Sequence, residues 1–251
     1  MPLEPSGKAG RAARTREPGD LPRPRNEAHA VGETAQEIER MRKLSPLFGA
    51  ALIALSATPA LAHHPLGGAT PATLMEGLLS GFGHPMIGFD HLAFIVAMGI
   101  AAAFTARPLL SPLAFVAATV AGCTVLLAGV GLPLVEIVVT GSVVLLGAMV
   151  LSGRRFAPGL WLALFAAAGL FHGYAYGEAI LGAEATPLAA YLVGFAAIQY
   201  AIAVGAGWVV RRVWRATDPA AIHPRLAGAV AAGVGVAFLI ENIEGMLFTV
   251  S

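Results

Sequence analysis

The sequence predicts an all-α, polytopic membrane protein with six transmembrane helices behind a cleavable signal peptide. Hydrophobic residues make up 57% of the chain and charged residues only 12%, with a mean hydropathy of +0.72. Soluble domains, in contrast, average about 25% charged residues. Six apolar stretches, each close to the ~20 residues that a helix needs to cross hydrocarbon, lie at 85–104, 109–129, 132–151, 157–175, 187–210 and 226–248.

The segment before these stretches has two parts of different character. Residues 1–40 hold seven of the sixteen basic and seven of the fifteen acidic residues, so we expect this part to be disordered. From Met41, a basic start, an apolar stretch and a small-residue end follow in the order of a secretory signal peptide, predicted at 41–62. Because a signal peptide normally begins a chain, we interpret residues 1–40 as a mis-assigned extension. The six-helix domain then covers 63–251.

Helix breaks and basic residues predict the topology. Proline, glycine and polar segments separate the six stretches, as expected at helix ends. The seven basic residues beyond the predicted signal peptide are all arginines and fall in the first, third and fifth connections, at 107, 154, 155, 211, 212, 215 and 225. The positive-inside rule therefore places these connections in the cytoplasm and the mature N-terminus outside. This topology is that of a multi-pass protein of the bacterial inner membrane.

Few His, Asp or Glu side chains lie in or beside the apolar stretches, and the predicted topology places these candidates in the outer half of the membrane or at its outer edge. They are His84, Asp90, His91, Glu136, His172, Glu178, Glu241 and Glu244. An ionisable side chain that faces lipid is costly, so these residues are candidates for a functional site. Imidazole with carboxylate suits nickel, cobalt, zinc or iron better than magnesium or calcium. The sequence therefore predicts a divalent transition-metal ion as the ligand.

Spacing limits how these residues can meet. In one regular helix, His84 and His91 would lie about 10.5 Å apart along the axis, which is too far for one ion held by ~2 Å bonds. Because Pro85 favours a helix start, we expect His84 at the mouth, just outside the first span, where it either folds inward or acts as a separate first station for the ion. Asp90 could ligate an ion or hydrogen-bond a ligating imidazole. His172, near the outer end of the fourth stretch, is predicted to meet His91.

Each candidate also has an ordinary structural interpretation. A histidine inside a membrane can be a hydrogen-bond partner between helices, and this alternative applies to His91 and His172. Acidic residues can be solvated or structural at helix ends, which applies to Glu178, Glu184, Glu136, Glu241 and Glu244. The pair at the predicted mature N-terminus is either a flexible end or a collector of metal: His63 and His64. We expect a buried small side chain at Cys123 and an ordinary loop residue at His223.

The motifs resemble those of the HupE/UreJ proteins, which are secondary nickel or cobalt permeases. The resemblance covers 63–251 and rests on His84, five intervening residues and Asp90-His91, and on Phe171-His172-Gly173 with a following Gly-Glu. It implies metal import that supplies hydrogenase, urease or cobalamin, with transport dependent on His84, Asp90, His91, His172 and Glu178. The family's usual pattern has one residue between the last glycine and the glutamate. Here Glu178 follows its glycine directly, so Glu184 is a rival for the acidic role.

We expect transport without ATP hydrolysis, because the sequence contains no phosphate-binding loop or nucleotide motif. It predicts no resident cofactor, no nucleic-acid partner and no enzyme activity, so the partners are a metal ion and the lipid bilayer. Two other functions stay open: an intramembrane metal-dependent hydrolase, whose ligands would look alike, and a metal-binding sensor or assembly factor that does not transport. The choice between nickel and cobalt, the energy coupling and the oligomeric state also stay open.

Overall fold

The computed structural model describes residues 69–248, so the predicted extension, the predicted signal peptide and the pair His63 and His64 lie outside the described part. Within this range every regular element is a helix, which confirms the all-α prediction. The elements are α2 (Leu74–Ile87), α3 (Phe89–Ala102), α4 (Ser111–Leu127), α5 (Val135–Ser152), α6 (Pro158–Gly177), the 3-10 turn η2 (Glu178–Ile180), α7 (Ala185–Trp208), the π-helical turn η3 (Val209–Val213) and α8 (Ile222–Phe248).

The helices bear out a polytopic membrane protein. Among the described residues, 4 helices are long and apolar enough to cross a membrane: α5, α6 with η2, α7 with η3, and α8. Helices α2 and α3 form one further candidate span, which is bent by 80° at the break between them. Helix α4 is apolar but shorter, with 17 residues. Hydropathy and length thus give 4 spans, or up to 5 with the bent pair, where the sequence predicted six.

The predicted start of the first span, at residue 85, is wrong. Helix α2 begins at Leu74, because Thr73 and Glu76 form a reciprocal capping box in which each side chain accepts a hydrogen bond from the other residue's backbone N–H. Pro85 lies inside α2 and does not start a helix. The break falls instead at Gly88, whose backbone is extended, with φ −73° and ψ 98°. The chain therefore enters the bundle as two short helices.

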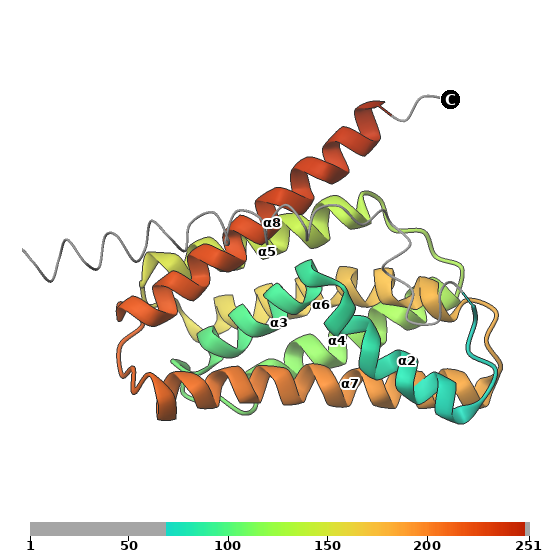
Figure 1. Ribbon diagram of the computed structural model, residues 1–251, viewed down its shortest axis with the longest axis horizontal. Coiled ribbons are helices and arrows are strands. Elements are labelled where there is room, and N and C mark those ends of the chain that lie inside the picture. Colours follow the sequence, from blue (N-terminus) through green and yellow to red (C-terminus); the bar gives the residue numbers. More distant parts are fainter. Residues whose placement is uncertain (1–68, 249–251) are drawn as a thin grey trace, which may run out of the picture. The chain divides into compact units, whose positions relative to one another are not determined.

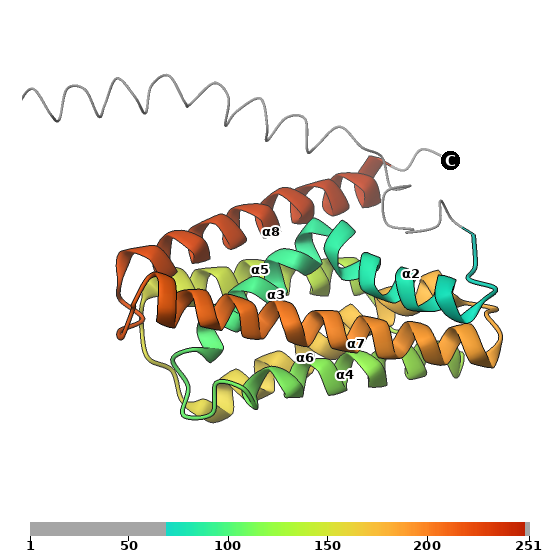
Figure 2. The same ribbon diagram turned by 60° about the horizontal axis from the view of Figure 1, so that its bottom comes forward.

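Helix α3 lies inside the bundle (Figures 1 and 2). It packs against α5, α7 and α8, while α2 pairs with α7, α4 with α6, and α5 with α8. Close backbone contacts hold these pairs together. A Cβ atom added to Gly173 of α6 would lie 2.0 Å from the carbonyl oxygen of Thr119 in α4, so only glycine allows this approach. Small residues at helix contacts are typical of membrane bundles.

The seven arginines of the described residues all lie in or beside the connections α3–α4, α5–α6 and α7–α8, at one end of the bundle (Figure 1). Some of them bind the carboxyl ends of helices. The Arg211 guanidinium donates to the carbonyl of Ala103, and Arg225 Nε donates to that of Leu151 at 2.9 Å. Positive charge at a helix C-terminus complements the helix dipole. These arginines therefore stabilise the ends of α3 and α5.

One exposed ion pair joins two connections at the same end. Arg155 and Asp218 lie 3.1 Å apart, and both side chains are well exposed. The pKa of Asp218 is lowered, first because the backbone N–H of Ala220 donates to its carboxylate and then because Arg155 does. An exposed pair of this kind contributes little to stability and is weakened by salt.

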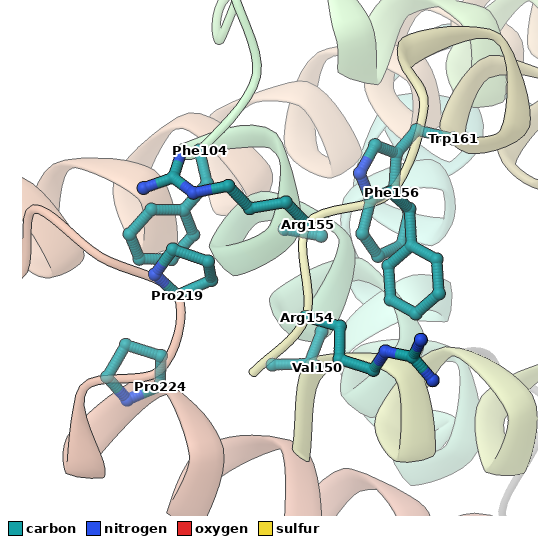
Figure 3. Close-up of a pocket in the computed structure, with 9 residues that line it drawn as sticks. Phe104, Val150, Arg154, Arg155, Phe156, Trp161, Pro219 and Pro224 are labelled. Atoms are coloured by element: carbon teal, nitrogen blue, oxygen red, sulfur yellow. The ribbon is translucent and has the colours of Figure 1, made fainter. Parts of the chain in front are cut away.

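A cavity of about 170 Å³ opens at the arginine-rich end (Figure 3). Its walls combine apolar and aromatic side chains with two arginines; they are formed by Ala101, Phe104, Val150, Arg154, Arg155, Phe156, Trp161, Pro219 and Pro224. None of these residues is a histidine or an acid. The cavity is therefore separate from the residues that the sequence singled out for metal.

Candidate functional site

Three predicted site histidines gather around the break between α2 and α3. His84 lies in the last turn of α2, His91 in the first turn of α3 and His172 in α6; their side chains are 4%, 4% and 0% exposed. The ring centroids of His84 and His91 are 6.5 Å apart, and those of His91 and His172 are 4.8 Å apart. The break at Gly88 therefore brings two imidazoles together that a straight helix would hold far apart.

His91 and His172 are in direct contact. Their Nδ1 atoms are 2.7 Å apart, which is a hydrogen-bond distance. The rings of Phe94 and Phe115 pack around His172, with centroids 4.7 Å and 5.5 Å from its own. The two histidines expected to meet therefore do so, in apolar surroundings. Their role as metal ligands stays a prediction.

A serine of α5 holds the far side of the His172 ring. Ser142 Oγ lies 3.0 Å from His172 Nε2 and donates to the carbonyl of Val139 at 2.7 Å. Both nitrogens of His172 thus have a partner, one on α3 and one on α5. The orientation of the ring is fixed by three helices.

The expectation that His84 sits at the mouth, outside the span, is wrong. Because α2 already starts at Leu74, the helix carries His84 into the bundle. There its Nδ1 lies 2.8 Å from the hydroxyl of Tyr191, which donates to the carbonyl of Tyr176 at 3.0 Å. The Tyr176 ring lies between the two histidines of the bent pair, with its centroid 4.9 Å from that of His84 and 4.3 Å from that of His91.

Asp90 is buried at the start of α3. Its side chain is 3% exposed, and its Oδ1 accepts a hydrogen bond from the backbone N–H of His91 at 2.8 Å. The first N–H groups of a helix have no partner within the helix. Asp90 satisfies one of them and places a negative charge at the positive end of the α3 dipole.

The other predicted acidic residues lie on the exposed surface. Glu178 is in η2, Glu184 is the N-cap residue of α7, and three more are also exposed: Glu136, Glu241 and Glu244. Within residues 69–248 no three His, Cys, Asp or Glu side chains are close enough together to hold a metal ion. In this structure the predicted ligands therefore form a histidine pair with neighbours, and not a closed metal cage.

Two further candidates have other surroundings. Cys123 is fully buried, as expected, and its thiol donates to the carbonyl of Gly173 at 2.9 Å. His223 belongs to the first turn of α8 and not to a loop, and its ring stacks on Trp214 with centroids 5.8 Å apart. Its place beside Arg225 puts it at the arginine-rich end, away from the other described histidines.

The predictions from the sequence did not include the hydroxyl and amide groups around the histidines. Ser142 and Tyr191 bind imidazoles, and the buried Tyr176 hydroxyl and Gln199 Oε1 have no hydrogen-bond partner among the described residues. Leaving such a group unsatisfied costs about 1–3 kcal/mol. A serine inside the apolar stretch 132–151 and the tyrosines of the segment GYAYGE were the signals available.

Two comparisons with known proteins identify the family of the chain. The profile of the HupE / UreJ protein family matches residues 51–238. Protein HupE from Rhizobium leguminosarum bv. viciae is 30% identical over 192 residues, which cover 75% of this chain and 95% of that protein. No solved structure matches the chain. The matched residues include His84, His91 and His172 and most of the helical bundle. The chain belongs to the HupE/UreJ family.

Proposed function

We propose that this protein is a secondary permease that imports nickel or cobalt across the bacterial cytoplasmic membrane. Members of its family are in general nickel or cobalt transporters associated with hydrogenase or urease. The observation that carries the proposal is the buried contact between His91 and His172, at a helix break inside the bundle. Family membership also favours transport over hydrolysis.

The distance between the two Nδ1 atoms suits a shared ion. Two nitrogen ligands with bonds of about 2.1 Å at right angles to each other lie roughly 3 Å apart, and the observed separation is 2.7 Å. A small movement of one ring would therefore let both nitrogens bind one ion. Imidazoles with a nearby carboxylate suit nickel and cobalt. The only cysteine, Cys123, binds a backbone carbonyl, so a tight thiolate site does not form here.

Six spans complete the proposed topology. Helix α4 has 17 residues and is thus about 25 Å long at 1.5 Å per residue, close to the ~30 Å of the hydrocarbon core. It lies along the spanning helix α6, so we include it as a span. The arginine-rich end then faces the cytoplasm. The proposed signal peptide at 41–62 is cleaved on the outer side of the membrane.

The ion path begins at the opposite end of the bundle. Glu178 and Glu184 in the α6–α7 connection are exposed there, and an acidic surface raises the local concentration of cations. We assign the same collecting role to Glu136, Glu241, Glu244, His63 and His64. The ion then passes His84 and reaches the pair His91 and His172, with Asp90 beside it.

Uptake of radioactive nickel and cobalt by expressing cells tests the proposal. His91→Ala and His172→Ala should reduce accumulation to that of cells without the protein, because each removes one nitrogen of the pair. His223→Ala is the matched control, since this histidine lies at the arginine-rich end, and it should leave uptake unchanged. Full uptake by His91→Ala at equal expression would refute the site. Binding without flux into proteoliposomes would show a sensor and not a permease.

The same assay separates the two metals and the driving force. Competition between nickel and cobalt in cells gives the order of preference, which the ligand chemistry leaves open. Collapse of the membrane potential should lower accumulation if the potential drives entry of the cation. Accumulation that persists under this treatment would contradict potential-driven import.

A further inference from the structure

The hydroxyl of Ser142 has one proton and two neighbours that compete for it. Its oxygen lies 2.7 Å from the carbonyl oxygen of Val139 and 3.0 Å from His172 Nε2. A carbonyl oxygen can only accept a hydrogen bond, so the serine proton goes to Val139. Both contacts are then satisfied only if His172 donates its Nε2–H to Ser142. The hydrogen-bond pattern therefore places a proton on His172 Nε2.

The other nitrogen of His172 follows from its surroundings. The ring is fully buried between Phe94 and Phe115, and no carboxylate of residues 69–248 is among its contacts. Burying a charge without a partner is very costly, so the ring is neutral and its Nδ1 has no proton. Consequently His91 donates its Nδ1–H across the 2.7 Å contact to His172 Nδ1.

The same logic applies to His84. The Tyr191 hydroxyl lies 3.0 Å from the carbonyl of Tyr176 and donates to it, so its oxygen accepts from His84 Nδ1 at 2.8 Å. His84 therefore carries a proton on Nδ1, so Nε2 is the ring nitrogen that is left to bind an ion. In two histidines from different helices, the position of a ring proton is thus determined by a hydroxyl group that donates its own proton to a backbone carbonyl.

From this pattern we infer that Ser142 and Tyr191 are positioning residues that fix the tautomers of His172 and His84. Ser142 makes Nδ1 of His172 the metal-binding atom and points it at His91. His172 is the preformed ligand of the pair, and His91 donates its Nδ1–H to it; this proton must leave His91 Nδ1 before that nitrogen can bind the ion as well. Tyr191 makes Nε2 the metal-binding atom of His84. The tautomers stand on geometry alone, whereas their consequence for uptake rests on the proposed function.

Ser142 differs from other hydroxyl residues of the spans. Ser152 and Thr124 also donate to a carbonyl three residues earlier in their helices, at 2.6 Å and 2.7 Å. Such bonds are ordinary for serine and threonine in helices. Neither of those oxygens contacts a histidine, whereas that of Ser142 does. The contact with His172, and not the bond along the helix, therefore gives Ser142 its role.

Nitrogen NMR of protein labelled in its histidine rings tests the tautomer directly, without any metal. The His172 signals, identified by their loss in His172→Ala, should show a protonated Nε2 and an unprotonated Nδ1. Ser142→Ala should shift them toward the opposite tautomer or a mixture. Ser142→Thr keeps the hydroxyl and should restore the original pattern, while Ser152→Ala should not change it. A protonated Nδ1 in the unaltered protein, or unchanged signals in Ser142→Ala, would overturn the inference.

Uptake measurements then connect the tautomer to transport. Loss of a hydrogen-bond partner behind a metal-binding histidine typically costs 10–100-fold in affinity or activity. We expect a loss of about that size for Ser142→Ala, with rescue by Ser142→Thr and normal uptake by Ser152→Ala. If Ser142→Ala shifted the NMR signals of His172 but left uptake normal, Ser142 would have no role in transport. Absence of uptake by the unaltered protein would instead overturn the proposed function and leave the tautomers intact.

Tyr191→Phe provides the corresponding test for His84, since it removes only the hydroxyl from a ring that stays packed on Phe195. The His84 signals should lose the fixed Nδ1–H pattern. Uptake at low metal concentration should fall by about 10-fold, with less effect at saturating metal, because His84 precedes the histidine pair on the proposed path. Unchanged His84 signals in this variant would contradict the role of Tyr191.

Discussion

The substitution Gly88→Ala is the most direct test of the link between the helix break and the histidine pair. An added Cβ would lie 2.7 Å from Cδ2 of the His91 ring, whereas carbon atoms in contact are about 3.5–4.0 Å apart. The ring must then retreat by at least about 0.8 Å. If this movement opens the 2.7 Å contact with His172, the separation becomes about 3.5 Å, which exceeds the usual hydrogen-bond limit of about 3.2 Å.

The expected result is loss of transport in a protein that still folds. A misplacement of about 1 Å in a reacting site can cost on the order of 100-fold, so we expect metal uptake to fall by about 10–100-fold. The fold should survive, because the clash is with a side chain and not with backbone.

Uptake of radioactive nickel and cobalt at matched expression, with thermal unfolding of the purified protein, measures both effects. The control is Gly205→Ala, since a Cβ at Gly205 meets nothing within 4 Å. Normal uptake by Gly88→Ala would refute the reasoning, because it would show that transport tolerates a displaced His91. If Gly88→Ala failed to fold while Gly205→Ala folded normally, the His91 side chain would not be able to move away from the added methyl group, contrary to this prediction.

Two further predictions follow from burial and exposure. Glu178 is exposed in η2, so Glu178→Gln should weaken metal uptake at low metal and low salt and leave the maximal uptake rate unchanged. Uptake measured over a series of metal concentrations tests this. Loss of the maximal rate would instead show that Glu178 is a metal ligand. Cys123 is fully buried and its thiol donates to a carbonyl, so maleimide reaches it only when the protein opens locally. If this opening costs about 3 kcal/mol, labelling should be at least about 100-fold slower in folded than in denatured protein. Equal labelling rates would show that solvent reaches this part of α4 in the folded protein.

The all-α class could be predicted because long apolar stretches indicate membrane-spanning helices, and such stretches are recognised from composition alone. The start of the bent pair could not be found in this way, since the segment before Pro85 contains many small and polar residues. The signal for that start was local: Thr73 and Glu76 have the spacing of a capping box. Pro85 is a misleading signal here, because proline often occupies the first turn of a helix. In the structure the end of α2 tolerates Pro85, and Gly88 makes the break.

The histidine pair was predictable because His91 and His172 lie at a similar depth below the outer ends of the first and fourth stretches. Their hydrogen-bond partners were not, since Ser142 and Tyr191 reach the histidines only through the packing of α5 against α6 and of α7 against α2. Hydropathy assigns these residues to spans but not to a face of a helix. Which polar residue of a span meets which histidine is decided by tertiary contacts.

The break in the first span also explains why a buried carboxylate is needed. A helix that starts inside the bundle places its positive dipole end, equivalent to about half a unit charge, beside His91 and, under the proposed function, beside a divalent cation. Asp90, buried at 3% exposure and bound to the His91 N–H at 2.8 Å, brings a full negative charge to that point. The carboxylate outweighs the dipole, so the field around the pair attracts a cation. The bend that unites the histidines would otherwise repel the cation of the proposed function, and Asp90 reverses that effect without having to bind it.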